Sequence, residues 1–170
     1  MRHFVCQALA KHHDRRSFRC GVAELDDYLQ HRARQDVRRR TAAVFVLVPE
    51  DQPQRVAGFY SLSSASIVLQ ELPDEFIKEL PRYPFVPAVL LGRLARDVSY
   101  PGIGRLLLLD ALARSLRHAD EVAAAVVLVD VKNERARQFY SRYGFQDIAS
   151  ESRRMYLPMK TVAKLLESES

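Results

Sequence analysis

The sequence predicts a single mixed α/β domain that spans residues 1–170. Three observations lead to this class. Apolar runs with strand character alternate along the chain with segments of helical periodicity. Two of the strand runs lead almost directly into a helix, one through a glycine-rich turn and the other through an asparagine. In addition, 48% of the residues are hydrophobic, which is enough for a packed core.

The composition excludes several classes of protein. With 26 Lys+Arg against 21 Asp+Glu, the chain carries a net charge of +5, which is compatible with a nucleic-acid partner. The two cysteines, Cys6 and Cys20, form no CxxC motif, so we expect neither a disulfide framework nor a metal site. Apolar runs are too short to span a membrane, and the N-terminus lacks the apolar stretch of a signal peptide. We therefore expect a cytoplasmic protein without a membrane anchor.

The first expected element is a helix over residues 21–40, because its apolar side chains recur at helical spacing. The second half of this segment is rich in arginine, including Arg34, Arg38 and Arg39. Two interpretations stay open. These cations can form a solvated face near the C-terminal end of the helix, where positive charge is favourable. Alternatively, they contact a phosphate backbone.

Two strands and a short helix follow. Residues 41–49 and 55–69 are rich in β-branched and aromatic residues and are separated by an acidic turn, which predicts an antiparallel hairpin. A short helix is expected over residues 72–82, since Pro73 and two acidic residues suit a first helical turn. Three closely spaced prolines then predict an extended connector.

The second half of the chain alternates strands and helices. Its first helix is apolar on nearly all sides, which predicts that it is well buried. The expected elements are strand 88–96, helix 102–118, strand 123–131, helix 133–143, short strands 146–148 and 154–159, and a tail helix 161–166.

The turn before the 102–118 helix has the composition of a phosphate-binding turn. Gly102 and Gly104 allow a ligand to approach the backbone closely, and a helix N-terminus offers N–H donors and partial positive charge. Arg105 can add a charge-assisted hydrogen bond. The same pattern also serves as an ordinary loop and cap, so both interpretations stay open.

Two residues of the 133–143 segment are candidates for chemistry. Asn133 suits the N-cap of this helix, and its amide can also bond a ligand beside the preceding strand. Tyr140 is either a core aromatic residue or a proton donor to a leaving group. The residues alone leave both questions open.

In their order along the chain, these motifs resemble the GNAT (Gcn5-related N-acetyltransferase) superfamily, and most closely the GNAT-type toxins of bacterial type II toxin–antitoxin modules. The resemblance extends over nearly the whole chain. It implies a GNAT fold, with a central mixed and mostly antiparallel sheet, splayed strands at 88–96 and 123–131, and flanking helices. The matching segments are Phe18-x-Cys20-Gly21 with Leu25-Asp26-x-Tyr28-Leu29, Gly58-Phe59-Tyr60-Ser61-Leu62, Leu91-Gly92-Arg93-Leu94-Ala95, Gly102-Ile103-Gly104-Arg105, Asn133 to Tyr140 with Tyr143-Gly144-Phe145, and Met155-Tyr156-Leu157-Pro158-Met159.

The resemblance also implies an activity and its residues. Such toxins use acetyl-CoA to acetylate the α-amino group of aminoacyl-tRNA, which blocks translation. The implied roles are a general acid at Tyr140, backbone pairing with pantetheine at Leu94, Ala95 and Arg96, pyrophosphate binding at Gly102, Ile103, Gly104 and Arg105, a cofactor contact at Asn133, and tRNA contacts at Arg34, Arg38, Arg39 and Arg93.

Partners follow from the same resemblance: a ribbon-helix-helix antitoxin with a disordered acidic tail, and a second copy of the chain in a homodimer. Two other functions remain open. One is acetylation of a small amine or of a protein N-terminus. The other is a GNAT-fold binding protein with impaired acetyl-CoA binding, because the 99–105 loop is shorter than the family pattern, contains Pro101, which has no N–H, and follows Arg96 where an apolar residue is usual.

Overall fold

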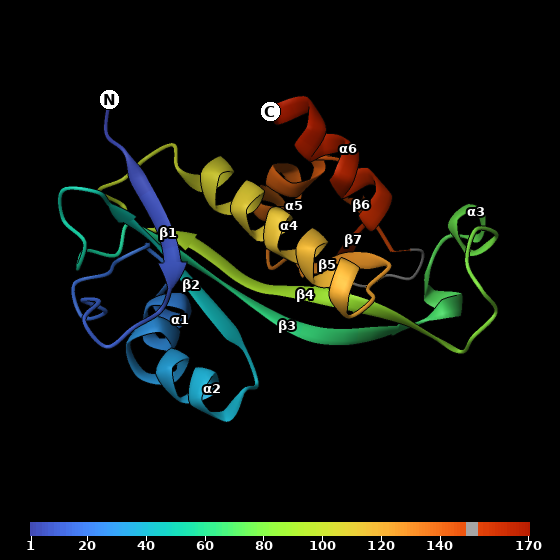
Figure 1. Cartoon of the computed structure of the whole chain (residues 1–170), viewed down its shortest axis with the longest axis horizontal. Coiled ribbons are helices and arrows are strands. Elements are labelled where there is room, and N and C mark those ends of the chain that lie inside the picture. The colour runs from blue at the N-terminus through green and yellow to red at the C-terminus, as the bar shows by residue number, and fades with distance from the viewer. Residues whose placement is uncertain (149–152) are drawn as a thin grey trace. The chain divides into compact units, whose positions relative to one another are not determined.

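The computed structural model describes residues 1–148 and 153–170 (Figure 1). Their strands form a seven-stranded sheet in the order β1-β2-β3-β4-β5-β7-β6. This mixed, mostly antiparallel sheet with flanking helices confirms the predicted fold class. The strands are β1 (Phe4–Ala8), β2 (Ala43–Pro49), β3 (Gly58–Val68), β4 (Phe85–Arg96), β5 (Val126–Asp130), β6 (Gln146–Asp147) and β7 (Arg154–Pro158).

The helices differ in length and type. Between α1 and α2 the chain forms one π-helical turn, η1, and a 3-10 turn, η2, follows β3. Among the described residues, no helix is long and apolar enough to cross a membrane. The helical elements are α1 (Ala23–Asp27), η1 (Tyr28–Arg32), α2 (Ala33–Arg39), η2 (Leu69–Glu71), α3 (Asp74–Ile77), α4 (Gly104–Glu121), α5 (Glu134–Ser141) and α6 (Met159–Glu169).

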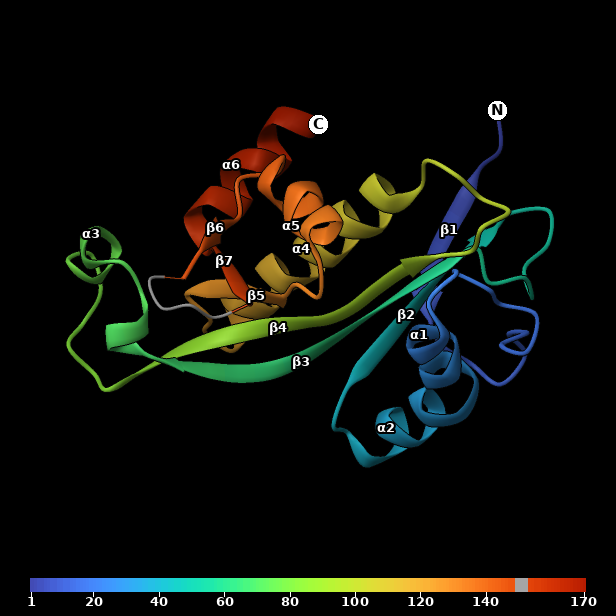
Figure 2. The same cartoon turned by 180° about the vertical axis from the view of Figure 1, so that it is seen from behind.

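The chain divides into two compact units, of which the first comprises residues 1–63 and 92–111. In this unit β1 pairs with β2, and β2 with β3, all antiparallel. Helices α1, η1 and α2 lie along these strands (Figures 1 and 2). Their apolar face is buried, with Tyr28 stacked on Phe59 and Phe18 edge-on to the same ring. The predicted hairpin and the predicted amphipathic helix thus form one core.

The second unit comprises residues 64–91 and 112–170. Here β5 lies between β4 and β7, parallel to the first and antiparallel to the second. Val126 to Val129 of β5 are fully buried, which explains why this strand reads as a continuous apolar run. The parallel pairing ends at Leu91↔Val129, one residue before the end of β5, whereas β4 continues to Arg96.

Several predicted boundaries were wrong. Strand β1 was not predicted, because its five residues show no regular alternation and only its pairing with β2 makes it a strand. The predicted helix 72–82 is only α3, followed by two turns in which Glu79 and Leu80 bond three residues back. The predicted helix 21–40 is interrupted by η1, where the N–H of Ala33 bonds the carbonyl of Tyr28, five residues back.

Smaller differences concern the ends of elements. Strand β5 begins three residues later than the predicted 123–131, and α5 ends two residues earlier than the predicted 133–143. The predicted 102–118 helix is α4, and the predicted tail helix 161–166 extends at both ends into α6. The apolar periodicity located each of these elements, but not its ends.

The buried His13 makes the first unit sensitive to acid. Its Nδ1 accepts a hydrogen bond from the N–H of Ala10 at 2.9 Å, and its Nε2 lies 2.8 Å from Oε1 of Gln7. Burial, with a smaller contribution from His12, lowers the pKa of His13 below its usual 6.5. The folded protein therefore keeps this ring neutral, whereas the unfolded chain binds a proton below about pH 6.5.

We expect the free energy of unfolding to be highest above about pH 6.5 and to decrease as the pH falls through the lowered pKa. Urea unfolding between about pH 7.5 and pH 5.5 measures this. His13→Gln should lose less stability on acidification, whereas His118→Gln, at an exposed site, should keep the wild-type dependence. An unchanged dependence in His13→Gln would show that another group is responsible.

Candidate active site

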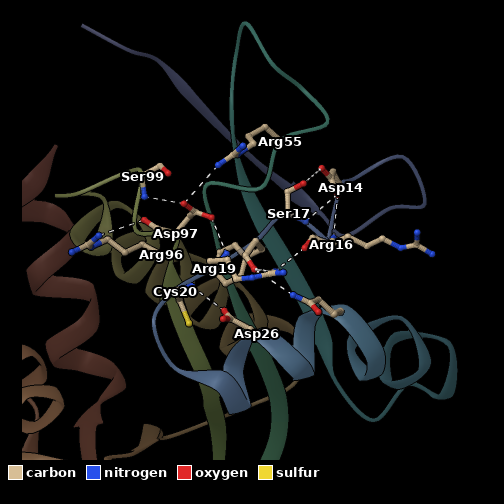
Figure 3. Close-up of polar contacts among 12 residues, drawn as sticks. Asp14, Arg16, Ser17, Arg19, Cys20, Asp26, Arg55, Arg96, Asp97 and Ser99 are labelled. Atoms are coloured by element: carbon tan, nitrogen blue, oxygen red, sulfur yellow. Dashed lines mark hydrogen bonds and ion pairs between the residues drawn. The ribbon is translucent and has the colours of Figure 1, made fainter.

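The turn that follows β4 is organised around the carboxylate of Asp97, which is only 1% exposed. One oxygen accepts the backbone N–H of Arg19 at 2.9 Å, and the other accepts that of Ser99 at 2.8 Å (Figure 3). The guanidinium of Arg55 lies 3.7 Å from the same carboxylate. A buried charge is stable only when it is paired in this way, so Asp97 fixes the start of the turn.

Tyr100 holds the middle of the same turn. Its backbone N–H donates to the carbonyl of Asp97 at 3.0 Å, and its ring is buried against the edge of Phe4. The guanidinium groups of Arg2 and Arg55 lie 5.5 and 5.6 Å from the centre of this ring. The turn is therefore anchored by a charge at one end and by an aromatic side chain at its centre.

The glycine-rich part of the turn presents backbone donors. Gly102 has φ +87°, a backbone conformation that favours glycine. A Cβ there would meet nothing within 4 Å, so the preference comes from the backbone and not from crowding. Helix α4 begins at Gly104, and its first backbone bond runs from the N–H of Leu107 to the carbonyl of Ile103 at 3.1 Å. The backbone N–H groups of Gly104 and Leu106 precede this bond and point out of the first turn, as is usual at a helix N-terminus.

The end of β4 lies close to β3 and α4 because Gly58 has no side chain. A Cβ on Gly58 would lie 2.7 Å from Cδ1 of Leu107 and 3.1 Å from the carbonyl oxygen of Ala95. Ala95 is buried, whereas Leu94 and Arg96 are half-buried, and Nη1 of Arg96 donates to the carbonyl of Asp97 at 3.4 Å. This close packing places the three predicted pantetheine residues and the glycine turn in one unit.

Arg93, also on β4, is held by an aromatic ring. Its guanidinium carbon lies 3.5 Å from the centre of the Tyr28 ring, and the hydroxyl of Tyr28 donates to Oδ2 of Asp36 at 2.8 Å. Burial and this hydrogen bond raise the pKa of Tyr28 to about 12, so the hydroxyl remains a donor. Within the described part of the chain, Arg93 forms no ion pair, so its N–H groups stay available for a ligand.

The other predicted tRNA contacts lie on α2. Arg38 and Arg39 are exposed and Arg34 is half-buried. None of the three pairs with a carboxylate among the residues that the structure describes. Their charge is therefore uncompensated by neighbouring side chains, which both interpretations of this segment allow.

Asn133 is the N-cap of α5. Its Oδ1 accepts the backbone N–H of Ala136 at 2.8 Å, which confirms the capping interpretation. The side chain is exposed, and its amide nitrogen is not used by the cap. A contact between this nitrogen and a ligand therefore remains compatible with the cap and stays a prediction.

Tyr140 lies in the last turns of α5 and is 8% exposed. Its ring packs edge-on against Phe139 and Phe145. Burial raises the pKa of its hydroxyl above the usual value of 10, and no residue that the structure describes forms a hydrogen bond with that hydroxyl. Tyr140 is thus a neutral group that holds a proton at physiological pH.

The predicted site residues fall into two groups, one in each compact unit. The second group consists of the start and the end of α5, at Asn133 and Tyr140. The first group consists of Leu94, Ala95, Arg96, Gly102, Ile103, Gly104, Arg105, Arg34, Arg38, Arg39 and Arg93.

Sequence reasoning missed three supporting residues. Nothing in the local pattern marks Asp97 as buried, since it stands between Arg96 and exposed Val98. Gly58 appeared only as part of a strand motif, and Tyr28 only as part of an apolar helix face.

Asp97→Asn should loosen the turn. The substitution removes the charge that Arg55 faces and turns one acceptor oxygen into a donor, so one backbone N–H loses its partner. We expect a loss of about 1–3 kcal/mol in the free energy of unfolding, measured in urea. Amide hydrogen exchange at Ser99 should also become faster. The exposed Asp51→Asn is the matched control; equal exchange at Ser99 in both variants would contradict this role for Asp97.

The chain is similar in sequence to curated toxins, although no protein-family model matches it. It is 36% identical over 163 residues to "Probable toxin TacT" of Sinorhizobium fredii, which covers 91% of this chain and 90% of that protein. It is 33% identical over 152 residues to "tRNA-acetylating toxin" of Mycobacterium tuberculosis, which covers 88% and 89% of the two chains.

Solved structures agree with this similarity. AtaT complexed with acetyl-methionyl-tRNAfMet matches with a TM-score of 0.88 at 26% identity, over 96% of this chain and 99% of that one. AtaTR bound with AcCoA matches with a TM-score of 0.83 at 26% identity, over 95% and 97%. The chain belongs to the family of GNAT-type toxins.

Proposed function

We propose that this protein is an N-acetyltransferase toxin that transfers the acetyl group of acetyl-CoA to the α-amino group of aminoacyl-tRNA and so blocks translation. The observation that carries the proposal is similarity along nearly the whole chain to a probable toxin and to a tRNA-acetylating toxin. The buried, neutral Tyr140 adds a chemical reason, because its motif position is that of the family's general acid.

The residues present fit acetyl-CoA. The N–H groups at the start of α4 and the positive end of the helix suit a pyrophosphate, although Pro101 supplies no donor. The backbone of Leu94, Ala95 and Arg96 would hold the pantetheine arm as an added strand, and Asn133 would contact the cofactor through its unused amide nitrogen. When bound, acetyl-CoA supplies an acetyl group activated as a thioester.

Tyr140 supplies the proton that the reaction needs. An amine that attacks the thioester carbonyl forms the amide bond, and the carbon–sulfur bond breaks, leaving a thiolate. In this proposal Oη of Tyr140 gives its proton to that sulfur, the amine loses its own proton to solvent, and solvent returns a proton to Tyr140. No covalent intermediate with the protein is required, because the amine itself is the nucleophile.

The charge distribution favours an RNA substrate over a small amine. Residues 11–40 contain nine Lys+Arg and five Asp+Glu, and so hold four of the five net positive charges of the chain. Several of these arginines have no carboxylate partner among the described residues, as shown above for α2. A phosphate backbone is the ligand that such a surface suits best. An assay that offers charged tRNA and spermidine in parallel separates the two substrates.

The alternative of a binding protein without acetyltransferase activity depends on the short 99–105 loop. Isothermal titration with acetyl-CoA separates this alternative from the enzyme. Binding at micromolar concentration supports the enzyme, whereas no binding to folded protein supports the alternative. The backbone donors of Gly104 and Leu106 at the start of α4 make binding the expected result.

Four further features belong to the proposal. A ribbon-helix-helix antitoxin would neutralise the toxin with an acidic tail that suits its basic surface. A second copy would complete a homodimer, as the family resemblance implies. Residues 1–170 would act as one domain, since β3 and β4 each contribute residues to both compact units. The protein would act in the cytoplasm, where charged tRNA is found.

Tyr140→Phe tests the general acid. The variant keeps the buried ring but removes the proton, so kcat should fall by about 10²- to 10⁴-fold, while the dissociation constant for acetyl-CoA stays within about threefold. Acetylation of charged tRNA and calorimetry measure the two quantities. Tyr143→Phe, one turn along the chain, is the matched control and should retain activity. If Tyr140→Phe retains wild-type kcat, another group protonates the sulfur.

The raised pKa of Tyr140 predicts the alkaline side of the pH–rate profile. The rate should rise as the attacking amine loses its proton, with a pKa of about 8 or lower. It should then stay level to about pH 10, because burial keeps Tyr140 protonated there. Initial rates with freshly charged tRNA measure the profile. A decline that begins near pH 8 would mean that a group of lower pKa is the acid.

A further inference from the structure

We propose that a pocket beside the π-helical turn η1 binds a phosphate group of the RNA backbone. The pocket belongs to the first unit and has a volume of about 280 Å³. This assignment rests on the proposed function in one respect, namely that RNA is the substrate. The lining residues are His13, Asp14, Arg15, Arg16, Gln30 and His31.

The π-helical turn places Arg15 at the pocket. Because the N–H of Ala33 bonds the carbonyl of Tyr28, the carbonyl of Leu29 loses the partner that an α-helix would give it. Nη1 of Arg15 approaches this carbonyl at 3.5 Å and donates to the carbonyl of Gln30 at 2.8 Å. One corner of the guanidinium is thus fixed by backbone, and its remaining N–H groups are left for a ligand.

The carboxylate of Asp14, which lines the pocket, already accepts hydrogen bonds from the turn that follows it. Asp14 accepts the backbone N–H groups of Arg16 at 3.1 Å and Ser17 at 3.3 Å, and the hydroxyl of Ser17 at 2.5 Å. These bonds lower the pKa of Asp14, which stays charged. In Figure 3 the side chain of Arg16 extends away from this carboxylate. No carboxylate among the described residues pairs with the Arg16 guanidinium, so its donors are left for a ligand.

The two histidines of the pocket use their ring N–H groups within the fold. His13 uses both ring nitrogens within the fold, at Ala10 and Gln7. His31 donates from Nδ1 to the carboxylate of Asp27 at 3.0 Å, so Nε2 of the neutral ring is an acceptor and adds no donor. The donors of the pocket therefore come from Arg15 and Arg16, and two guanidinium groups suit an anion with several oxygen atoms.

Repulsion among the cations favours the same ligand. Arg15 is partly buried, and both Arg34 and Arg16 lie close enough to disfavour its charged form electrostatically. A bound phosphate would relieve this repulsion and accept paired hydrogen bonds from a guanidinium. An extended polyanion fits better than a free phosphate ion, because Arg34, Arg38 and Arg39 continue the line of cations along α2.

The test measures RNA binding without catalysis. A fluorescein-labelled RNA hairpin with a single-stranded 3′ end is titrated with the full chain at several KCl concentrations, and anisotropy gives the dissociation constant. Arg16→Ala should weaken binding about 5- to 10-fold and reduce the slope of log Kd against log[KCl] by about one. Arg82→Ala removes an exposed arginine elsewhere and should change binding less than twofold.

Two further measurements test the site: the RNA affinity of Arg15→Lys, and the kinetic constants of Arg16→Ala in the acetylation assay. The lysine keeps the charge but not the planar fork, so we expect binding as weak as in Arg16→Ala. In the acetylation assay, Arg16→Ala should raise KM for charged tRNA about 5- to 10-fold and leave kcat and the KM for acetyl-CoA within twofold. A fall in kcat with unchanged RNA affinity would overturn the phosphate site.

The outcomes separate this inference from the proposed function. If Arg16→Ala and Arg82→Ala weaken RNA binding equally, the pocket is not a phosphate site, even when charged tRNA is acetylated. If Arg16→Ala impairs only the binding of an acidic antitoxin peptide, the pocket serves a protein and the inference is overturned. If the hairpin binds as expected but no charged tRNA is acetylated, the phosphate site stands and the proposed function fails.

Discussion

The buried carboxylate of Asp97 is the interaction on which the candidate cofactor site depends. It lies where β4 ends, and it receives backbone donors from two segments far apart in the sequence, at Arg19 and Ser99. A charge with 1% exposure would be very unfavourable without these partners and Arg55. The carboxylate of Asp97 therefore joins the N-terminal loop, the end of β4 and the turn that leads into α4.

In the first compact unit, residues 1–63 and 92–111, arginine side chains either support the fold or remain available to a ligand. Arg15 and Arg55 are partly structural, since one binds backbone carbonyls of the π-helical turn and the other faces Asp97. Arg93 is held by the face of Tyr28, which leaves the edge of its guanidinium uncommitted. Aromatic and carbonyl partners orient a guanidinium without neutralising it, unlike carboxylates. A basic surface oriented in this manner can present fixed donors to a phosphate backbone.

Much of the fold could be predicted from the sequence, because apolar periodicity marks every strand and helix with a large buried face. Val126 to Val129 and the apolar side chains of α4 are examples. Prediction failed where regular structure depends on a distant partner. Strand β1 exists through its pairing with β2. Helix α3 has a local cause instead: it ends at Ile77, four residues before Pro81, which has no N–H to continue the helix. Asn133 and the start of α5 were predictable, since a cap is a local interaction.

By itself, the sequence determined the fold class, the order of nearly all elements, the family and the identity of Tyr140 as the candidate acid. These depend on periodicity and on motif order, which are properties of neighbouring residues. Tertiary structure decided the burial of Asp97 and Tyr140, the π-helical turn and the stacking of Arg93 on Tyr28. Apart from the π-helical turn, each of these joins or encloses groups that are separated along the chain, 78 residues apart for Arg19 and Asp97. Only packing brings such groups together, and only packing sets the desolvation that shifts their pKa values.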